Sequence, residues 1–290
     1  MKEQTVYLNG KYLKKSRAKV SFLDHGLLYG DGVFETLRVY EKKVFKTKAH
    51  INRLFTSADN IFLNIPLNFE RIKYIIYKLI SLNSIINGYV RITVTRGTGE
   101  PGLDLSLCKA PTVIVYAKEL RKYPSEFYSK GVSAIIASTV KNHPLAINPS
   151  VKSCNFLNNI MAKAEAGGNR AFEAIMLSTE GHVTEGSFSN VFIVMNDMLL
   201  TPPLETGLLG GITRNVVIEL ARKSGIRVHE RNLSRRHLYA AQECFITSSL
   251  MEIMPVTRID RKKINNGKPG VITNYLMAGY AKLTGGLNEK

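Results

Sequence analysis

The first third of the chain combines strand-like and helical patterns of apolar residues. Residues 5–13 predict two short strands joined at Asn9 and Gly10, a dipeptide favoured in tight hairpins because both of its residues adopt positive φ. Apolar residues recur at helical spacing over residues 72–80, with charged residues on the other faces, which predicts an amphipathic helix. Runs of β-branched and aromatic residues predict strands at 33–40, 89–95 and 112–117. These elements indicate a sheet with a helix packed on it.

The rest of the chain predicts a second group of strands interrupted by helices. One helix is predicted over residues 155–165, ended by Gly167 and Gly168, and another over residues 213–223, ended by Gly225. The predicted strands lie at 132–138, 174–177, 191–195, 227–230 and 243–247.

A polar and aromatic segment, residues 118–129 with Pro124 inside it, separates the two groups. We therefore predict an N-terminal α/β domain over residues 1–120, an interdomain linker over 121–129 and a C-terminal domain over 130–290. The fold class is α/β in the broad (α+β) sense, with a smaller N-terminal α/β domain and a larger, β-rich C-terminal one.

Composition narrows the classes of partner. The net charge of +17 would suit a basic binding protein, but the 40 lysines and arginines are spread along the chain without a cluster, so we expect no nucleic-acid partner. No run reaches the roughly 18 apolar residues of a membrane span, and the first residues lack the apolar core of a signal peptide, so we expect a cytoplasmic protein without membrane contact. The scattered Cys108, Cys154 and Cys244 indicate neither a disulfide framework nor a metal site.

Lys152 is the first candidate for chemistry. Taken alone, it is one basic residue among many, and such lysines are usually solvated. It follows Pro149, Ser150 and Val151 at a predicted strand-to-helix junction, before a helix with few charges. A lysine partly removed from water becomes a usable amine nucleophile towards aldehydes.

Three further segments carry polar groups that suit a phosphorylated heteroaromatic ligand. Glu185 lies at a strand end before a turn of small residues, where it is either simply exposed or faces a ring nitrogen and keeps it protonated. The Gly-rich residues 207–211 lead directly into a helix, whose first N–H groups suit a phosphate, although the lysine of a P-loop is missing. Residues 247–249 add three hydroxyls after a strand.

With these segments in place, the sequence resembles the class IV, or fold-type IV, pyridoxal-phosphate enzymes. This group includes branched-chain aminotransferases, D-amino-acid aminotransferases and aminodeoxychorismate lyases. The resemblance covers nearly the whole chain and rests on six motifs in series: DHGLLYGDGVFETLRVY (24–40), HINRL (50–54), VKSCNFLNNIMAKAEA (151–166), HVTEGSFSNVF (182–192), GGITR (210–214) and TSSLMEIMPV (247–256).

The resemblance implies that pyridoxal 5'-phosphate is the cofactor and that Lys152 carries it as a Schiff base. It implies that Glu185 pairs with the pyridine nitrogen and that Asn190 supports the adjacent strand. Arg53 would bind the phosphate, and the remaining phosphate ligands would be Ile212, Thr213, Ser248 and Ser249. At least a homodimer is expected, with amino acids and 2-oxo acids as substrates.

The resemblance further implies that Lys152, once displaced by the substrate amine, removes the Cα proton. In a transaminase Lys152 returns this proton to the cofactor, a 2-oxo acid leaves, and a second oxo acid such as 2-oxoglutarate accepts the amino group. The same lysine is therefore both the anchor and the base.

The substrate residues favour a branched-chain-like aminotransferase. Residues 96–103, RGTGEPGL, lack the Arg-x-His pair with which D-amino-acid aminotransferases hold the substrate carboxylate, whereas Tyr89 and Arg91 match the Tyr-x-Arg strand of branched-chain enzymes. The full set of candidate substrate-binding residues is Phe34, Thr36, Arg38, Tyr89, Arg91 and Leu250.

Two positions keep a lyase open as the alternative. Branched-chain enzymes usually have Gly where Thr36 lies, and a Tyr that bonds the cofactor's phenolic oxygen where Phe156 lies. GVFET and TSSLMEIMPV are closer to aminodeoxychorismate lyases, which expel pyruvate and give 4-aminobenzoate. A D-amino-acid aminotransferase is the second alternative.

Overall fold

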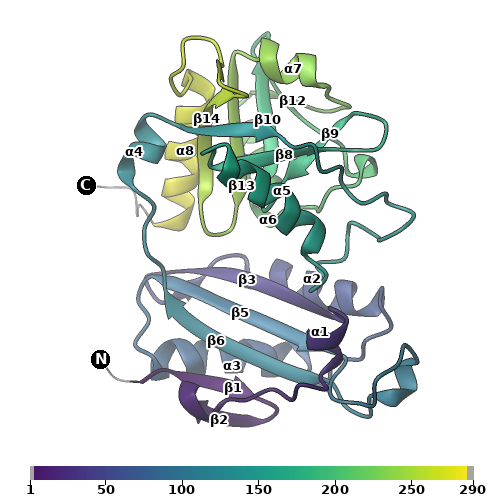
Figure 1. Cartoon of the computed structure of the whole chain (residues 1–290). Helices are drawn as coiled ribbons and strands as arrows, with labels where there is room; N and C mark the ends of the chain where they lie inside the picture. Colours follow the sequence, from purple (N-terminus) through teal and green to yellow (C-terminus); the bar gives the residue numbers. More distant parts are fainter. Residues whose placement is uncertain (1–2, 286–290) are drawn as a thin grey trace. The chain divides into compact units, whose positions relative to one another are not determined.

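The computed structural model describes residues 3–285, which form two compact units (Figure 1). The first unit contains the residues up to Arg121 together with Val151–Phe156, and the second contains Lys122–Ser150 and the residues from Leu157 onward. The domain limits proposed from the sequence place Val151–Phe156 in the C-terminal domain, whereas in the structure these residues belong to the first unit. Those limits, 1–120 and 130–290 with a linker at 121–129, stay a proposal.

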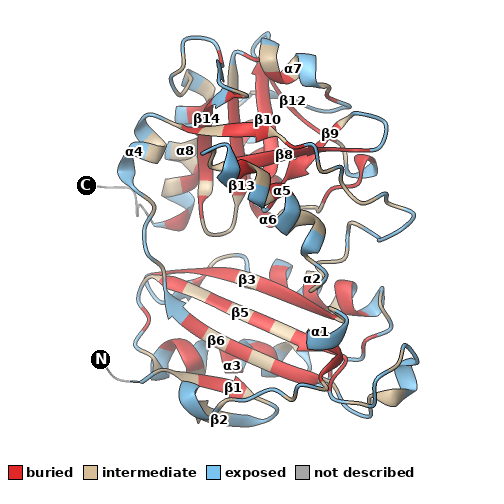
Figure 2. Ribbon diagram, viewed as in Figure 1, coloured by how far each residue is buried: buried red, intermediate tan, exposed pale blue. Residues whose placement is uncertain are grey.

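The first unit is built on a six-stranded sheet in the order β2-β1-β6-β5-β3-β4, in which all neighbours are antiparallel. Helices α2 and α3 pack against this sheet, and their apolar side chains form one core with it. In Figure 2, β3 is buried along almost its whole length, whereas buried and intermediate residues alternate along most of β5 and in β6, which ends in two exposed residues. The elements are β1 (Thr5–Leu8), β2 (Lys11–Lys14), the 3-10 helix η1 (Lys15–Arg17), α1 (His25–Leu28), β3 (Gly32–Tyr40), β4 (Lys43–Val44), α2 (Thr47–Asp59), α3 (Phe69–Leu82), β5 (Gly88–Thr95), η2 (Leu105–Leu107) and β6 (Thr112–Glu119).

The second unit is built on a nine-stranded mixed sheet in the order β12-β11-β10-β13-β14-β7-β8-β9, with β15 paired to β14. Three neighbouring pairs, β11 with β12, β14 with β7 and β7 with β8, are parallel. The elements are α4 (Ser125–Ser129), β7 (Val132–Ile136), α5 (Leu157–Gly168), β8 (Glu173–Leu177), β9 (Val183–Gly186), β10 (Asn190–Met195), β11 (Met198–Thr201), η3 (Leu204–Thr206), α6 (Ile212–Lys223), β12 (Arg227–Glu230), α7 (Arg235–Ala240), β13 (Glu243–Ser248), β14 (Glu252–Ile259), β15 (Lys262–Lys263) and α8 (Val271–Thr284).

Helices pack on this second sheet and close its apolar surfaces. Helix α5 contacts β8 through Ala162 and Ala166, whose small side chains allow a close approach. Helices α6 and α8 contact each other and β13, and α8 also contacts β14. Helix α6 is therefore held against β13 and α8.

Several predicted elements agree with the structure. Asn9 and Gly10 form the turn between β1 and β2 with φ of 43° and 89°, and the helical pattern at 72–80 lies in α3. The predicted helix at 213–223 is α6, followed by Gly225 at φ 75°.

Other predictions were wrong in position. The helix predicted over 155–165 is α5, which begins at Leu157 and includes both predicted terminal glycines, and the chain turns instead at Arg170, with φ of 54°. Part of the predicted linker is helical, since α4 lies within it, and the strand predicted over 132–138 ends at Ile136. Within residues 3–285 there is no helix long and apolar enough to cross a membrane.

Candidate active site

The segment around Lys152 lies along the edge of β3 in the first unit. The Phe34 N–H donates to the Lys152 carbonyl (2.9 Å), the Cys154 N–H donates to the Gly32 carbonyl (2.7 Å), and the Lys152 N–H donates to Ser57 Oγ (3.1 Å). These bonds hold the backbone of the half-buried Lys152 on both sides. The predicted strand-to-helix junction is therefore a short extended segment, with α5 beginning at Leu157.

Two cations approach one aromatic ring next to this segment. The Lys152 ammonium lies 4.8 Å from the centre of the buried Phe34 ring, and the Arg91 guanidinium lies 3.8 Å from the same centre. Phe156 packs edge-on against Phe34 with 5.5 Å between ring centres. The ring attracts each cation. The ring thereby holds two cationic side chains next to each other, which is a setting suited to an anionic substrate group.

Five of the six candidate substrate residues share one face of the first sheet. Side chains alternate along a strand, so Phe34, Thr36 and Arg38 of β3 project to the same face. The register pairs Thr36 with Arg91 and Arg38 with Tyr89 of β5, which adds those two side chains to this face. Leu250, the sixth, belongs to the second unit, where it follows β13 and is half-buried.

The polar side chains on this face differ in how many hydrogen bonds they already make within the protein. Arg38 Nη1 donates to the carbonyls of Val39 (3.2 Å) and Gly88 (2.8 Å), and the guanidinium lies 4.7 Å from the Tyr40 ring centre. Burial, and secondarily Tyr116, raises the pKa of Tyr89, which keeps its hydroxyl protonated at neutral pH. By contrast, Arg91 has no hydrogen bond or ion pair to any residue within 3–285.

Arg53 of α2 is bound by a carboxylate on the other face of β3. Arg53 Nε lies 2.5 Å from Glu35 Oε1, its Nη2 donates to Glu35 Oε2 (3.0 Å), and His50 Nδ1 lies 2.7 Å from the same Oε2. Burial alone raises the pKa of the Glu35 carboxyl, but Arg53 and His50 outweigh this and bring the pKa down to about 2. Because His50 and Arg53 are three residues apart, one helix face presents both to Glu35.

In the second unit, Glu185 of β9 lies in an ion pair. Glu185 Oε1 is 2.7 Å from the Lys141 ammonium, and the side chains of both residues are largely buried, with 9% and 13% exposed. Glu185 Oε2 accepts from the Leu209 N–H (3.1 Å). The carboxylate is therefore held in position by a lysine and by a backbone amide at the start of the Gly-rich turn.

Asn190, the first residue of β10, holds the other end of the same peptide segment. Its Nδ2 donates to the Leu209 carbonyl (2.9 Å). A side chain at Gly211 would bring its Cβ to 1.9 Å from Asn190 Oδ1, so only glycine fits there. Glu185 and Asn190, from two strands, thus fix the turn that leads into α6.

The start of α6 and the end of β13 present donors that suit a phosphate. Helix α6 begins at Ile212 and Thr213, and its N-cap Gly211 has no side chain to satisfy the N–H groups of the first turn. β13 ends at Thr247 and Ser248, followed by Ser249, and α6 packs against β13. Thr247 Oγ1 is buried without a hydrogen-bond partner in the part of the chain that the structure describes.

A buried carboxyl supports the turn between Glu185 and Asn190. Glu173 Oε1 accepts from the Ser187 N–H (3.1 Å) and hydroxyl (2.5 Å), and Oε2 accepts from the Ser189 hydroxyl (2.6 Å). Burial raises the pKa of Glu173, and the bonds from the two serines oppose it. These bonds lock the turn at both serines and so fix the strands on either side.

The structure therefore brings the sequence-predicted residues together in groups within each unit. In the first unit, one group comprises Phe34, Thr36, Arg38, Tyr89, Arg91 and Lys152. In the second unit, a group at strand and helix ends comprises Glu185, Asn190, Ile212, Thr213, Ser248 and Ser249. Sequence reasoning did not single out Glu35, His50 or Lys141 as partners. The i,i+3 spacing of His50 and Arg53 is the one signal that could have suggested the first two.

Comparisons with known proteins agree on one family. A family model described as amino-transferase class IV matches residues 32–259. A protein of Methanocaldococcus jannaschii, provisionally named as a branched-chain-amino-acid aminotransferase, is 44% identical over 271 residues, which cover 93% of each chain. The D-alanine aminotransferase of Bacillus licheniformis is 34% identical over 268 residues, covering 92% of this chain and 93% of that protein.

Solved structures share the fold over nearly the whole chain. The Escherichia coli branched-chain amino acid aminotransferase superposes with a TM-score of 0.93 at 29% identity, covering 100% of this chain and 97% of that one. The branched-chain amino acid aminotransferase of Thermobaculum terrenum, solved in its PLP-bound holo form, gives a TM-score of 0.87 at 27% identity, covering 97% and 94%. The predicted fold class is confirmed.

Proposed function

The chain belongs to the class IV aminotransferase family, and from this premise we propose that it is a pyridoxal-phosphate-dependent branched-chain amino acid aminotransferase. It transfers the amino group of a branched-chain amino acid to a 2-oxo acid such as 2-oxoglutarate. Support comes from the 44% identity to the Methanocaldococcus jannaschii protein and from the likeness to branched-chain aminotransferase structures. A cytoplasmic location and a homodimer stay predictions from the sequence.

The observation that carries the proposal is the arrangement around Leu209. Glu185 and Asn190 bond the N–H and the carbonyl of this residue, which places a buried carboxylate beside the start of α6. The donors there fit a phosphorylated heteroaromatic group: an uncapped helix start, a glycine where a Cβ has no room, and the unpartnered Thr247 hydroxyl among the described residues. The cofactor, when bound, supplies an electron-withdrawing ring that makes the substrate Cα proton acidic.

In this proposal each residue of the second unit has a defined task. The Ile212 and Thr213 N–H groups, the Thr213 hydroxyl and the hydroxyls of Ser248 and Ser249 bind the phosphate at the positive end of the helix dipole. Glu185 would accept a hydrogen bond from the ring nitrogen of the cofactor, and Lys141 orients that carboxylate through their ion pair. Asn190 holds the Gly-rich turn in place.

In the first unit, Arg53 is the guanidinium proposed for the phosphate, oriented by its paired bonds to Glu35. Lys152 is the covalent anchor of the cofactor, and its Nζ takes the proton from the substrate Cα and later returns it. The backbone bonds on either side of Lys152 limit the motion of its Nζ to the side chain itself. One amine can therefore serve both proton transfers.

Arg91 is the proposed ligand of the substrate carboxylate. It has no anionic partner among residues 3–285, whereas Arg38 on the same face already donates to two carbonyls. In the proposal, the Tyr89 hydroxyl is a second donor to the substrate, and Thr36 of β3 lies opposite Arg91 of β5 in the register. Phe34 on the same face offers apolar surface, which suits an aliphatic side chain, and the role of Leu250 stays a prediction from the sequence.

The test compares three reactions of the holoenzyme. The proposal predicts that L-leucine with 2-oxoglutarate gives glutamate, and that Arg91→Ala raises KM for leucine at least tenfold because a charge-assisted pair is lost. Lys11→Ala, which removes an exposed cation from the edge strand β2, leaves KM unchanged.

The other two reactions separate the alternatives. Turnover of D-alanine instead of L-leucine would favour the activity of the Bacillus licheniformis relative, and pyruvate with 4-aminobenzoate from aminodeoxychorismate would favour the lyase. The lyase is kept because Phe156 packs on Phe34 and has no hydroxyl to bond the cofactor's phenolic oxygen. Either result without leucine turnover would overturn the proposal.

A further inference from the structure

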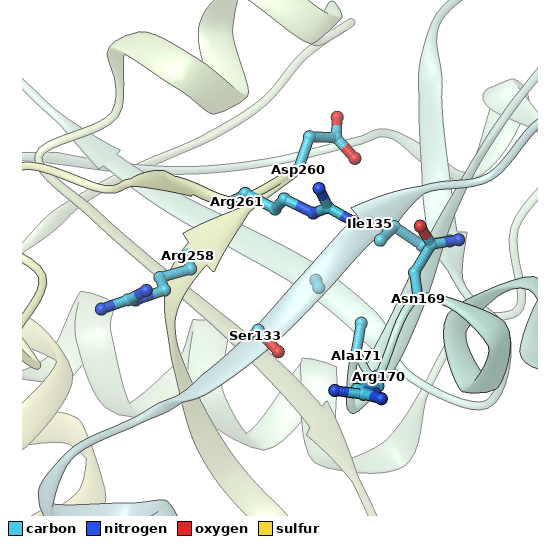
Figure 3. Close-up of a pocket in the computed structure, with 9 residues that line it drawn as sticks. Ser133, Ile135, Asn169, Arg170, Ala171, Arg258, Asp260 and Arg261 are labelled. Atoms are coloured by element: carbon cyan, nitrogen blue, oxygen red, sulfur yellow. The ribbon is translucent and has the colours of Figure 1, made fainter.

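The second unit has a cavity of about 330 Å³ that shares no residue with the candidate active site. It lies along β7, between the end of β14 and the loop that follows α5 (Figure 3). Its lining residues are Ser133, Ala134, Ile135, Asn169, Arg170, Ala171, Arg258, Asp260 and Arg261. We refer to this cavity as the arginine pocket.

Three arginines line the arginine pocket, and within residues 3–285 none of them is paired. Arg170, Arg258 and Arg261 are exposed, and their side chains make no hydrogen bond or ion pair with any other residue in the described range 3–285. Three arginines on one cavity, each without a carboxylate partner, differ from Arg53, Arg96 and Arg214, which all lie in ion pairs. The cavity therefore holds positive charge that the protein itself does not neutralise.

The single carboxylate of the pocket is committed elsewhere. Asp260 Oδ1 accepts from the Ile136 N–H (3.0 Å), and Oδ2 accepts from the Tyr239 hydroxyl (2.6 Å). Figure 3 shows the Asp260 carboxylate turned away from the other labelled side chains. Both of its oxygens are thus used, and the three guanidinium groups with one carboxylate leave a formal charge of +2 on the lining.

The positions of the arginines follow from the backbone. Arg258 of β14 lies opposite Ser133 of β7 in the register, so the two side chains are neighbours on one face of the sheet. Arg261 is in the two-residue turn between β14 and β15, and Figure 3 shows it reaching across β7 towards Ile135. Arg170 lies in the turn after α5. Two turns and a strand therefore supply charge around a floor that is partly apolar.

Two of these arginines occupy backbone conformations that usually select glycine. Arg170 and Arg261 have φ of 54° and 66°, in the left-handed region where a Cβ is unfavourable. Neither side chain makes a hydrogen bond or ion pair within the described residues that would offset this unfavourable backbone conformation. An anionic ligand would give both side chains a function.

We propose that the arginine pocket binds a small organic dianion. Arginine binds carboxylates and phosphates through paired N–H groups, and a ligand with two negative charges would neutralise the +2 lining. Ile135 and Ala171 provide apolar surface for the carbon skeleton of the ligand, and the Ser133 hydroxyl adds a neutral donor. A dicarboxylate and a phosphate monoester share this chemistry, and the experiment distinguishes them.

The experiment is calorimetric titration of the purified holoenzyme, freed of excess cofactor, with succinate, with glycerol 3-phosphate and with uncharged glycerol. The variants are Arg258→Ala, Arg261→Ala and Arg258→Lys. Arg227→Ala is the matched control, because Arg227 is an exposed arginine on β12, at the opposite edge of the same sheet. Bound-cofactor absorbance and basal activity equal to those of the wild type show that each variant is folded.

At least one dianion is expected to bind the wild type and Arg227→Ala with the same Kd, and glycerol is expected not to bind. Each pocket alanine variant should raise Kd about tenfold or more, because a charge-assisted hydrogen bond is lost. Arg258→Lys should give a smaller rise, since it keeps the charge and loses the paired geometry. Tighter binding of succinate or of glycerol 3-phosphate identifies the class of ligand.

Two results would overturn the proposal. One is the absence of binding by both dianions at millimolar concentration. The other is a Kd that is the same in Arg258→Ala, Arg261→Ala and the wild type, which would place the bound anion somewhere other than the arginine pocket. Because the readout is heat of binding, either result leaves the proposed aminotransferase activity untouched.

Discussion

Replacing Glu35 by glutamine removes a charge that is completely buried between Arg53 and His50. The Glu35 side chain is 1% exposed, and its carboxylate bonds both of these side chains. Its pKa of about 2 lies below the ordinary 4.5, so the charged form stabilises the folded chain above pH 4.5, and this contribution is lost as pH falls from about 4.5 to about 2. Glu35→Gln should therefore destabilise the protein in a pH-dependent way.

The size of this effect follows from the pKa. Each pKa unit corresponds to about 1.4 kcal/mol, so lowering the pKa from 4.5 to about 2 gives about 3 kcal/mol of stabilisation at pH 7. At pH 3 the carboxyl of the unfolded chain is mostly protonated, and linkage leaves about 1 kcal/mol. The difference between the wild type and Glu35→Gln should thus fall by more than half between pH 7 and pH 3.

Urea unfolding followed by circular dichroism at the two pH values measures this difference. Glu70→Gln is the matched control in the same unit, because the Glu70 side chain is 75% exposed and lies 3.8 Å from Lys73. Its effect should stay within about 0.5 kcal/mol at both pH values. A Glu35→Gln effect of the same size at pH 7 and pH 3 would refute the reasoning, because it would show that the buried charge is not the source of the stability.

Two further substitutions test the second unit. Gly211→Ala should lower the free energy of unfolding by about 1–3 kcal/mol and weaken cofactor binding, because the new Cβ would lie 1.9 Å from Asn190 Oδ1 and displace that side chain. Gly168→Ala is the control, because the space around Gly168 is open. Equal urea unfolding curves for the two variants would contradict the steric argument. Lys141→Met should lower the free energy of unfolding by about 3 kcal/mol at neutral pH, because it leaves the Glu185 carboxylate buried without its cation. Urea unfolding measures this change. Unchanged stability would show that the ion pair is dispensable.

Much of the fold could be predicted from the local spacing of apolar residues, because this spacing indicates which side chains are buried. The hairpin at Asn9 and Gly10 and the helix α3 follow from turn chemistry and from a clean amphipathic spacing. Strand β14 was missed because Pro255 lies inside it, and proline is unusual in a central strand. β7 pairs with β14 only from Val256 onward, so the missing N–H of Pro255 removes no hydrogen bond between β14 and β7.

The candidate site was predictable only in part. The motifs led to Lys152, Glu185 and the start of α6, but the partners of these residues depend on strand pairing across long separations. Lys141 is far from Glu185 in sequence, and no local pattern indicates that their charges meet. The arrangement of Thr36 beside Arg91 likewise depends on the register of β3 with β5, which the sequence of one strand does not determine.

The most direct measurement of the central claim identifies the lysine that holds the cofactor. The holoenzyme is reduced with borohydride, digested and analysed by mass spectrometry. The account predicts the phosphopyridoxyl group on Lys152, and Lys152→Ala should lose both the modification and the visible absorbance, while Lys11→Ala on the edge strand β2 keeps both. Modification of Lys141 or of any other lysine in the wild-type protein, or retention of the visible absorbance by Lys152→Ala, would contradict the account.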